Sequence, residues 1–201
     1  KAVYEWDDTN KYWVAKKIDF TAAVTDMAYF GGLLWVAPGS DNDCYTFNGT
    51  STWTEKTDIK ADCLLVYKGY LYRAYNGTSN EVYYTSDGTT WSSSPWYVGN
   101  AARGEDIHGL AGYEYDVYAL TGYGMYVLGP ESRHGDLVDQ LLDYSSQTTV
   151  YNGRGARAWA KDGKLYFNVA HSLLSYQEGL LDSVGPDGDA GLPSGRQGTV
   201  K

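Results

Sequence analysis

Short runs of aromatic and β-branched residues, separated by turns that contain Gly, Asp or Asn, recur along this chain. The segment Tyr83–Trp91 opens with two tyrosines, has the tight-turn pair Asp87-Gly88 in its middle and ends in Thr-Thr-Trp. Aromatic and β-branched residues suit a pleated, half-buried surface, and Asp-Gly suits a two-residue turn. The pattern therefore predicts a β-hairpin over this segment.

The same frame occurs earlier in the chain. Tyr45–Trp53 again sets one aromatic eight residues before another, with Asn48-Gly49 as the turn, and Tyr4–Tyr12 fits the frame more loosely. The three segments start roughly 40 residues apart, which is the period of a reused antiparallel unit. Superposing Trp35 on Tyr72 and Tyr45 on Tyr83 keeps two neighbouring units in register, with spacings of 37 and 38 residues. The sequence therefore indicates, above all, that one structural unit is repeated along the chain.

Each complete unit reads as about four short strands joined by Gly turns. In the first complete unit, 39–43 is expected to be a loop between strands. In the third unit, the spacing of apolar residues within 131–144 predicts one or two helical turns in place of the outer hairpin. The expected units are a half unit at 1–19 and full units at 23–55, 60–96, 107–144 and 155–184.

Four-stranded antiparallel units at this period cannot bury their faces alone, so they stack around an axis as a β-propeller. The prediction is an all-β fold, a propeller or partial propeller of about four blades plus a half blade, in one domain over 1–201. These units do not obviously close a ring, and we expect the 201 residues to be part of a longer chain. The alternative is an open stack of β-meanders whose ends are capped by partner subunits.

Composition supports this fold class and excludes some functions. The 201 residues include 20 Tyr, 7 Trp and 24 Gly but only 2 Met, which describes an all-β chain better than a helical one. The net charge of -9 argues against nucleic-acid binding, because a protein must present a basic face to displace counterions from phosphates. No stretch approaches the ~20 apolar residues of a membrane-spanning helix, so membrane insertion is not expected.

The turn Thr85–Trp91 resembles the Asp-box, the Ser/Thr-x-Asp-Gly-x-Thr-Trp turn of sialidase-type and related propellers. Asn48, Gly49 and Trp53 form a partial copy that lacks the Asp. The resemblance implies a propeller fold and a structural role for Asp87, Gly88 and Trp91, and it transfers no catalytic residue. The fuller repeat also looks like the propeller repeats of phage tail and virion proteins.

Catalytic chemistry finds little support in the sequence. A sialidase-like glycosidase needs a cluster of arginines, and the candidates are spread over several units without a distinguishing spacing: Arg73, Arg103, Arg133, Arg154 and Arg157. No phosphate loop, serine elbow or Cys/His nucleophile motif occurs. The three histidines lack the spacing of metal ligands, and no cofactor is expected. We therefore expect a protein without enzymatic activity.

Two weaker features remain open. Asp187 and Asp189 alternate in a Gly-rich loop, a pattern that can ligate calcium but that also suits a plain solvated loop. Cys44 and Cys63 fall in strands of neighbouring units, 19 residues apart, where they form either a disulfide or a pair of small buried apolar side chains.

Aromatic residues in loops are the remaining candidates for binding. Tyr75, Trp96, Tyr97 and Tyr123 could stack on sugars or anchor a protein partner, whereas most other aromatics fill space between blades. We expect a structural or receptor-binding component of an extracellular or virion assembly of the phage-tail kind. Its partners would be other protein subunits and surface glycans. The alternative is a carbohydrate-active or glycan-binding propeller related to sialidases.

Overall fold

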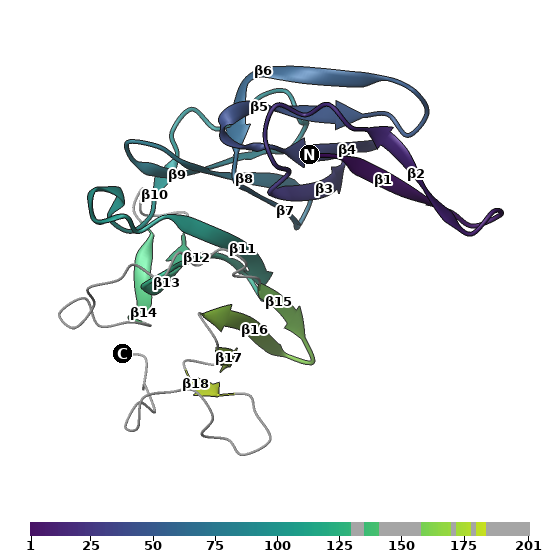
Figure 1. Cartoon of the computed structure of the whole chain (residues 1–201). Helices are drawn as coiled ribbons and strands as arrows, with labels where there is room; N and C mark the ends of the chain where they lie inside the picture. The colour runs from purple at the N-terminus through teal and green to yellow at the C-terminus, as the bar shows by residue number, and fades with distance from the viewer. Residues whose placement is uncertain (130–134, 141–157, 170–171, 178–179, 184–201) are drawn as a thin grey trace.

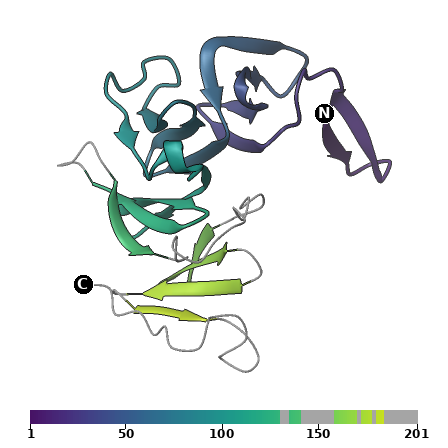
Figure 2. The same ribbon diagram turned by 60° about the vertical axis from the view of Figure 1, so that its left-hand side comes forward.

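The computed structural model describes residues 1–129, 135–140, 158–169, 172–177 and 180–183, and within them the chain is almost entirely β-structure. A two-stranded antiparallel hairpin comes first, formed by β1 (Val3–Asp7) and β2 (Tyr12–Lys17). Four-stranded sheets follow it along an arc, with the hairpin at one end and the last sheet at the other (Figures 1 and 2). The expected all-β, partial-propeller architecture is confirmed.

Each four-stranded sheet is an antiparallel meander in chain order, and we call it a blade. Blade 1 has β3 (Asp26–Phe30), β4 (Leu33–Ala37), β5 (Gly39–Phe47) and β6 (Trp53–Ala61). Blade 2 has β7 (Cys63–Tyr67), β8 (Tyr70–Asn76), β9 (Asn80–Thr85) and β10 (Trp96–Tyr97).

A short 3₁₀ helix, η1 (Ala101–Arg103), leads into the second pair of blades. Blade 3 has β11 (Ile107–Tyr113), β12 (Asp116–Thr121), β13 (Gly124–Leu128) and β14 (Asp136–Gln140). Blade 4 has β15 (Ala158–Lys161), β16 (Lys164–Val169), β17 (Ser172–Gln177) and β18 (Leu180–Ser183). The first strands of successive blades, β3, β7, β11 and β15, contact one another in turn and form the inner side of the arc.

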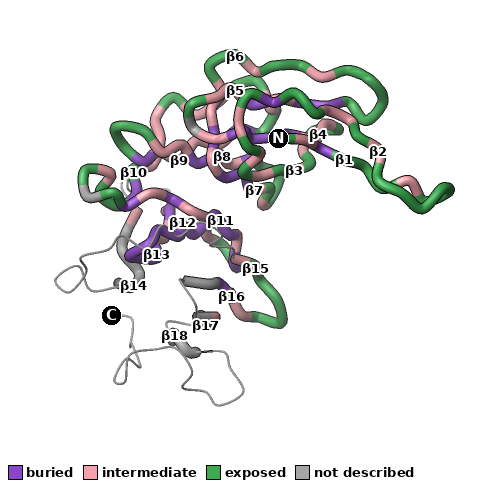
Figure 3. Tube along the Cα trace, viewed as in Figure 1, coloured by how far each residue is buried: buried purple, intermediate pink, exposed green. Residues whose placement is uncertain are grey.

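The core consists of layers between successive blades. Successive residues along a strand point to opposite faces, so a blade with a neighbour on each side buries one face on the preceding blade and the other on the following blade. Between blades 1 and 2, for example, Trp35 and Cys44 pack against Leu64 and Leu71. Figure 3 shows burial concentrated on the strands of the blades, whereas much of the β1–β2 hairpin is exposed.

Tight turns join the first two strands of a blade, and their sequences fit the backbone that they adopt. Lys68 and Gly69 both have positive φ, at 47° and 81°, as the favoured two-residue hairpin turn requires. Asp162 and Gly163 repeat this arrangement in blade 4, at 51° and 73°. Gly supplies the second position because it adopts positive φ without a steric penalty.

Three local predictions were wrong. The segment 39–43 is not a loop but the first part of β5, whose pairing with β6 is irregular there. The strand that pairs with β9 is not Thr89–Trp91 but β10, because the turn after Thr85 is wider than two residues. The helical turns expected within 131–144 are absent from the described part, where 136–140 is strand β14 paired to β13. The open hydrogen-bonding edge of β13 overrides a weak helical periodicity.

Candidate binding surface

The β1–β2 hairpin is held in shape by the turn at its tip. The carboxylate of Asp7 accepts hydrogen bonds from the backbone N–H groups of Thr9, at 2.9 Å, and Asn10, at 3.0 Å. Lys11 takes positive φ, at 57°, and donates its backbone N–H to the Asp7 carbonyl. Hydrogen bonds from the side chain and backbone of Asn10 hold the pKa of Asp7 below its ordinary value, so the turn keeps an ionised carboxylate.

One face of this hairpin carries exposed aromatic rings. Trp6 and Trp13 are cross-strand partners, with ring centroids 5.4 Å apart in an edge-to-face arrangement. Tyr4, Trp6 and Trp13 are 52%, 41% and 63% exposed, and Tyr4 and Trp13 line a shallow hollow of about 460 Å³. We call these three side chains the aromatic face.

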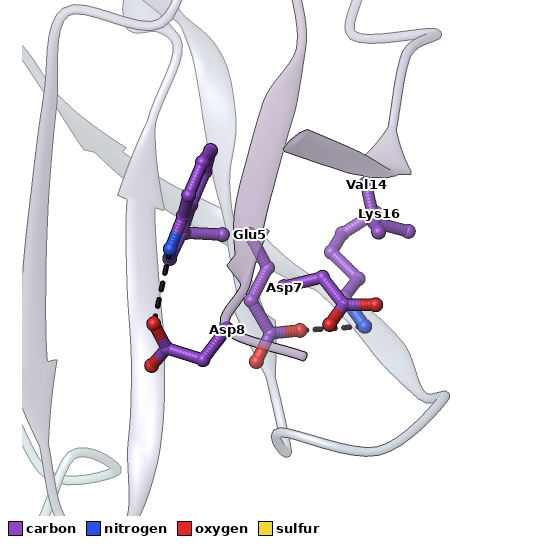
Figure 4. A pocket seen from close by; sticks show the side chains of 6 residues that line it. Glu5, Asp7, Asp8, Val14 and Lys16 are labelled. Atoms are coloured by element: carbon purple, nitrogen blue, oxygen red, sulfur yellow. Dashed lines mark hydrogen bonds and ion pairs between the residues drawn. The ribbon is translucent and has the colours of Figure 1, made fainter. Parts of the chain in front are cut away.

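Most charged groups of the hairpin lie on the face opposite to the aromatic face. A second hollow of about 280 Å³ lies on the hairpin, and Glu5, Asp7, Asp8 and Lys16 are among its lining residues. In Figure 4, Glu5 and Asp7 lie close to Lys16, whereas Asp8 points away from it. Lys16 forms an ion pair with Glu5 at 2.6 Å, and the indole N–H of Trp6 donates to the Asp8 carboxylate at 3.1 Å. The hairpin therefore carries exposed rings on one face and most of its charged groups on the other, with Asp8 beside Trp6 near the tip.

The corresponding face of blade 1 is an internal interface. Tyr45 occupies the position of Tyr4 in the repeat, and the cross-strand pair Phe47 and Trp53 corresponds to the Trp6–Trp13 pair. Phe47 and Trp53 stack at 4.7 Å, and Phe20 packs edge-on against Tyr45 and Trp53. The surface that is covered within blade 1 is therefore exposed on the hairpin.

The turn Thr85–Trp91 is held in shape by hydrogen bonds to the side chain of Asp87. The carboxylate of Asp87 accepts hydrogen bonds from the backbone N–H groups of Thr89 and Thr90, each at 2.7 Å, and from the Thr85 hydroxyl at 3.0 Å. The bonds from Thr90 and then Thr89 lower the pKa of Asp87 well below its usual range. Gly88 has φ 74°, and Trp91 packs edge-on against Trp35 of blade 1.

Asn48 performs the same task in blade 1. Its side-chain oxygen accepts hydrogen bonds from the backbone N–H groups of Thr50, Ser51 and Thr52, at 3.0 to 3.2 Å. Gly49 has φ 83°. An amide oxygen can therefore replace the Asp carboxylate at this turn.

The four aromatics predicted to bind a ligand have different surroundings. Trp96 donates its indole N–H to the carbonyl of Gly129 at 2.8 Å, and its ring lies 5.0 Å from that of Tyr84. It packs against the cluster between blades 2 and 3. Tyr123 is 4% exposed, Tyr75 is partly buried, and Tyr97 is 36% exposed. Ligand binding by Tyr75, Trp96, Tyr97 and Tyr123 stays a prediction.

Both cysteines are buried, and no disulfide joins them. Cys44 lies in the layer between blades 1 and 2, whereas Cys63 belongs to the layer between blades 2 and 3. Burial raises the pKa of the Cys44 thiol to about 12, so this sulfur is neutral and unreactive at ordinary pH. The structure thus shows the second of the two alternatives, a pair of small buried apolar side chains.

Arg73 packs inside the molecule and is not presented to an open site. It is 8% exposed, donates from Nη1 to the Lys60 carbonyl at 2.6 Å, and lies over the rings of Tyr83 and Trp91. Burial lowers its pKa from the ordinary arginine value. The other candidate arginines give no structural test, because 133, 154 and 157 lie outside the described residues and only the backbone of 103 is described.

A buried carboxylate that the sequence did not single out organises the junction between blades 2 and 3. Glu105 is 1% exposed and accepts hydrogen bonds from the Tyr126 hydroxyl at 2.6 Å, the Thr121 hydroxyl at 2.8 Å and the Asn100 backbone N–H at 2.9 Å. The Asn80 side chain also donates to its backbone carbonyl. Each donor comes from a different segment, so Glu105 ties them together. The sequence around Glu105, where Asp106 follows it directly, does not predict this role.

Metal binding receives no support from the described residues, in which no three His, Cys, Asp or Glu side chains are grouped to hold an ion. The calcium candidates Asp187 and Asp189 lie outside the described residues. Nor does any helix in the described ranges have the length and apolar character to span a bilayer.

No family model and no curated protein matches the sequence. Solved structures do match the fold. A chain of the nidogen/laminin complex has a TM-score of 0.60 at 10% identity, over 84% of this chain and 64% of that one. A streptogramin B lyase has a TM-score of 0.57 at 15% identity, over 85% and 58%.

A third match is YCF48 bound to a D1 peptide, with a TM-score of 0.53 at 14% identity over 92% of this chain and 59% of that one. The chain therefore spans about three fifths of the length of these three structures. At such low identity the likeness concerns the fold alone. These neighbours are β-propeller-like proteins, and the arc of four-stranded blades described above is a β-propeller-like fold.

Proposed function

We propose that this protein is a non-enzymatic binding component of an extracellular or virion assembly, of the phage-tail kind, that docks a protein partner on its aromatic face. The observation that carries the proposal is the exposure of Tyr4, Trp6 and Trp13 on a surface whose counterpart in blade 1 is an internal interface. Aromatic rings dominate the energetics of protein interfaces, because they bury large areas at low entropic cost.

The composition of the aromatic face suits a protein partner. Each ring is between 41% and 63% exposed, so docking would remove substantial apolar area from water. Asp8, which accepts a hydrogen bond from the Trp6 indole, lies beside the rings and would form part of a polar rim of the kind that surrounds interface hot spots. Asp8 and the net charge of -9 favour a partner with a neutral or basic surface.

The structural neighbours have mixed functions. The solved structures include a complex of nidogen with laminin and YCF48 bound to a peptide, and both support protein binding as a use of this architecture. A lyase also shares the fold, so the fold itself decides nothing about catalysis. The packing of Arg73 between two rings weighs against the arginine cluster that a sialidase-like enzyme would need.

Glycan binding is the second candidate function, and the hollow between Tyr4 and Trp13 favours it. Exposed rings stack on the apolar faces of sugars, and Asp8, which accepts a hydrogen bond from Trp6, could accept another from a sugar hydroxyl. The two candidates use the same side chains and differ in the partner.

Site-specific photo-crosslinking tests the proposal. A photoreactive phenylalanine derivative would replace Trp13 in the chain produced in its natural source, and a matched chain would carry it at Tyr115, which is 87% exposed on blade 3. We expect one defined protein crosslinked from position 13 and absent from position 115. The same crosslinked species from both positions, or none from position 13, would overturn the proposal. Trp13-dependent binding on a glycan array without a protein crosslink would establish the second candidate.

A further inference from the structure

The tripeptide Asn-Gly-Thr occurs in neighbouring blades, at 48–50 and at 76–78. Asn48 follows β5 directly, and Asn76 is the last residue of β8. An asparagine before glycine is prone to lose its side-chain amide, because glycine has no side chain to hinder attack by its own backbone nitrogen. A third Asn-Gly pair, at 152–153, lies outside the described residues. The two described copies share their sequence, so a difference in reactivity between them comes from the fold.

The first copy lies at the surface, in the turn between β5 and β6. Asn48, Gly49 and Thr50 are all exposed, so water reaches the side-chain amide. Gly49 has φ 83°, and no other described residue lies within 4 Å of the position that a side chain would occupy there. The turn therefore leaves open space around the peptide bond between Asn48 and Gly49.

The turn also directs hydrogen bonds at the atom where charge develops during attack on the amide. Oδ1 of Asn48 accepts hydrogen bonds from the backbone N–H groups of Thr50, Ser51 and Thr52, at 3.0 to 3.2 Å. It also accepts one from the Thr50 hydroxyl at 3.0 Å. When a nucleophile adds to the amide carbon, this oxygen becomes negatively charged, and donors already aimed at it stabilise the intermediate.

The second copy is held by the next blade. The side-chain nitrogen of Asn76 donates to the Ile107 carbonyl at 2.9 Å, and its Oδ1 accepts the Ile107 backbone N–H at 2.8 Å. The backbone nitrogen of Gly77, which would be the attacking atom, donates to the Ser79 carbonyl at 3.3 Å. Reaction at Asn76 would therefore require these hydrogen bonds between and within the blades to break first.

We propose that Asn48 is a site of spontaneous deamidation in the folded protein, promoted by the hydrogen bonds of its turn, and that Asn76 is protected. The backbone nitrogen of Gly49 attacks Cγ of Asn48 and forms a cyclic succinimide. The bond from Cγ to the side-chain nitrogen breaks, and that nitrogen leaves as ammonia with the proton given up by Gly49. Water then opens the ring, at the side-chain carbonyl to give aspartate or at the backbone carbonyl to give isoaspartate.

The aspartate product suits the turn, because blade 2 already has an aspartate in this role. Asp87 accepts the backbone N–H groups of Thr89 and Thr90, each at 2.7 Å. A carboxylate at position 48 would meet the backbone donors that now bind the Asn48 oxygen. Deamidation would thus convert the turn of blade 1 into the charged form that blade 2 has. This inference goes beyond the proposed function and does not depend on it.

Peptide mapping of the full chain tests the proposal. The folded chain and a chain unfolded in guanidinium chloride are incubated at mildly alkaline pH, and mass spectrometry after trypsin digestion gives the fraction converted at each asparagine. In the folded chain we expect Asn48 to convert about tenfold faster than Asn76 or more, because Asn76 must first release its hydrogen bonds. In the unfolded chain the two copies should convert at similar rates. Equal rates in the folded chain would overturn the proposal, as would retention of Asn48 while the unfolded chain converts.

A substitution at Thr50 tests whether the turn promotes the reaction. Thr50→Val removes the hydroxyl that donates to Asn48 and keeps the backbone donors, so conversion of Asn48 in the folded chain should slow about threefold. Conversion in the unfolded chain should not change. Thr78→Val makes the same substitution in the second copy and should leave the rate at Asn48 unaltered. An unchanged rate in folded Thr50→Val would overturn the part of the proposal that assigns promotion to the turn.

Discussion

Replacing Leu71 with alanine tests whether layers between blades hold this fold together. Leu71 is 0% exposed and belongs to the layer formed with Trp35 and Leu64. The substitution removes three buried carbon groups, a loss of about 2.4 kcal/mol at ~0.8 kcal/mol each. A residual cavity adds to this loss, so we expect destabilisation by about 3 to 4 kcal/mol.

The matched control is Val66→Ala. Val66 lies directly opposite Leu71 in the β7–β8 pairing but is 40% exposed, so its truncation should cost about 1 kcal/mol or less. Urea unfolding followed by circular dichroism gives both free energies of unfolding. Equal losses for the two variants would refute the argument, because they would show that the interior between blades 1 and 2 contributes no more than an exposed strand position.

Three further predictions concern individual residues. Glu105→Ala removes the carboxylate that accepts hydrogen bonds from the Tyr126 hydroxyl and other buried donors. Urea unfolding should therefore show a free energy of unfolding lower by about 3 kcal/mol. A loss below ~1 kcal/mol would contradict the role of Glu105 in joining these segments. Because the folded-state pKa of Asp87 is lowered, its stabilisation is present above the unfolded pKa and is lost as pH falls through the folded pKa. The difference in urea midpoint between the wild type and Asp87→Asn should therefore shrink as pH falls below ~4, and a constant difference would exclude the carboxylate as the cause. Gly69 has φ 81°, so Gly69→Ala should lower the free energy of unfolding by about 1 kcal/mol and lower the thermal midpoint accordingly. Gly129 lacks positive φ, so Gly129→Ala should change the free energy of unfolding by less than ~0.5 kcal/mol.

The repeat could be predicted from the sequence because each blade places large residues at fixed positions. Trp35 and Tyr72 occupy the same place in the second strand of their blades, and this spacing survives although the residues differ. The positions of the turns could also be predicted, since Asn48 and Asp87 both accept hydrogen bonds from the backbone of the turn that follows. Local side-chain chemistry determines these features, so a single sequence reveals them.

Other features depend on contacts that no local pattern contains. Strand β14 forms where the edge of β13 needs a partner, against the helical spacing within 131–144. The acceptor role of Glu105 depends on Thr121 and Tyr126, which approach it only after blade 3 has folded. Tyr123 looked like an exposed loop aromatic and is 4% exposed, because packing determines its burial.

The aromatic face could not be predicted from the sequence for a related reason. Tyr4 and the segment that follows it were readable as half a blade, and in a complete blade these rings would be covered. Only the structure shows that Trp6 and Trp13 remain exposed. In the equivalent pair of blade 1, Phe47 stacks on Trp53, and Trp53 packs against Phe20. The candidate surface therefore comes from the position of the hairpin at the end of the arc.

Hydroxyl-radical footprinting of the full chain, resolved to single residues by mass spectrometry, tests the central claim most directly. The claim is that successive blades cover one another and that the end carrying the hairpin is bare. We expect strong labelling of Trp13, Met27 and Tyr29 and protection of Leu64 and Leu110, whose repeat position matches that of Met27. Protection of Met27 equal to that of Leu64 would contradict the account, because it would show that the first blade is covered like the others.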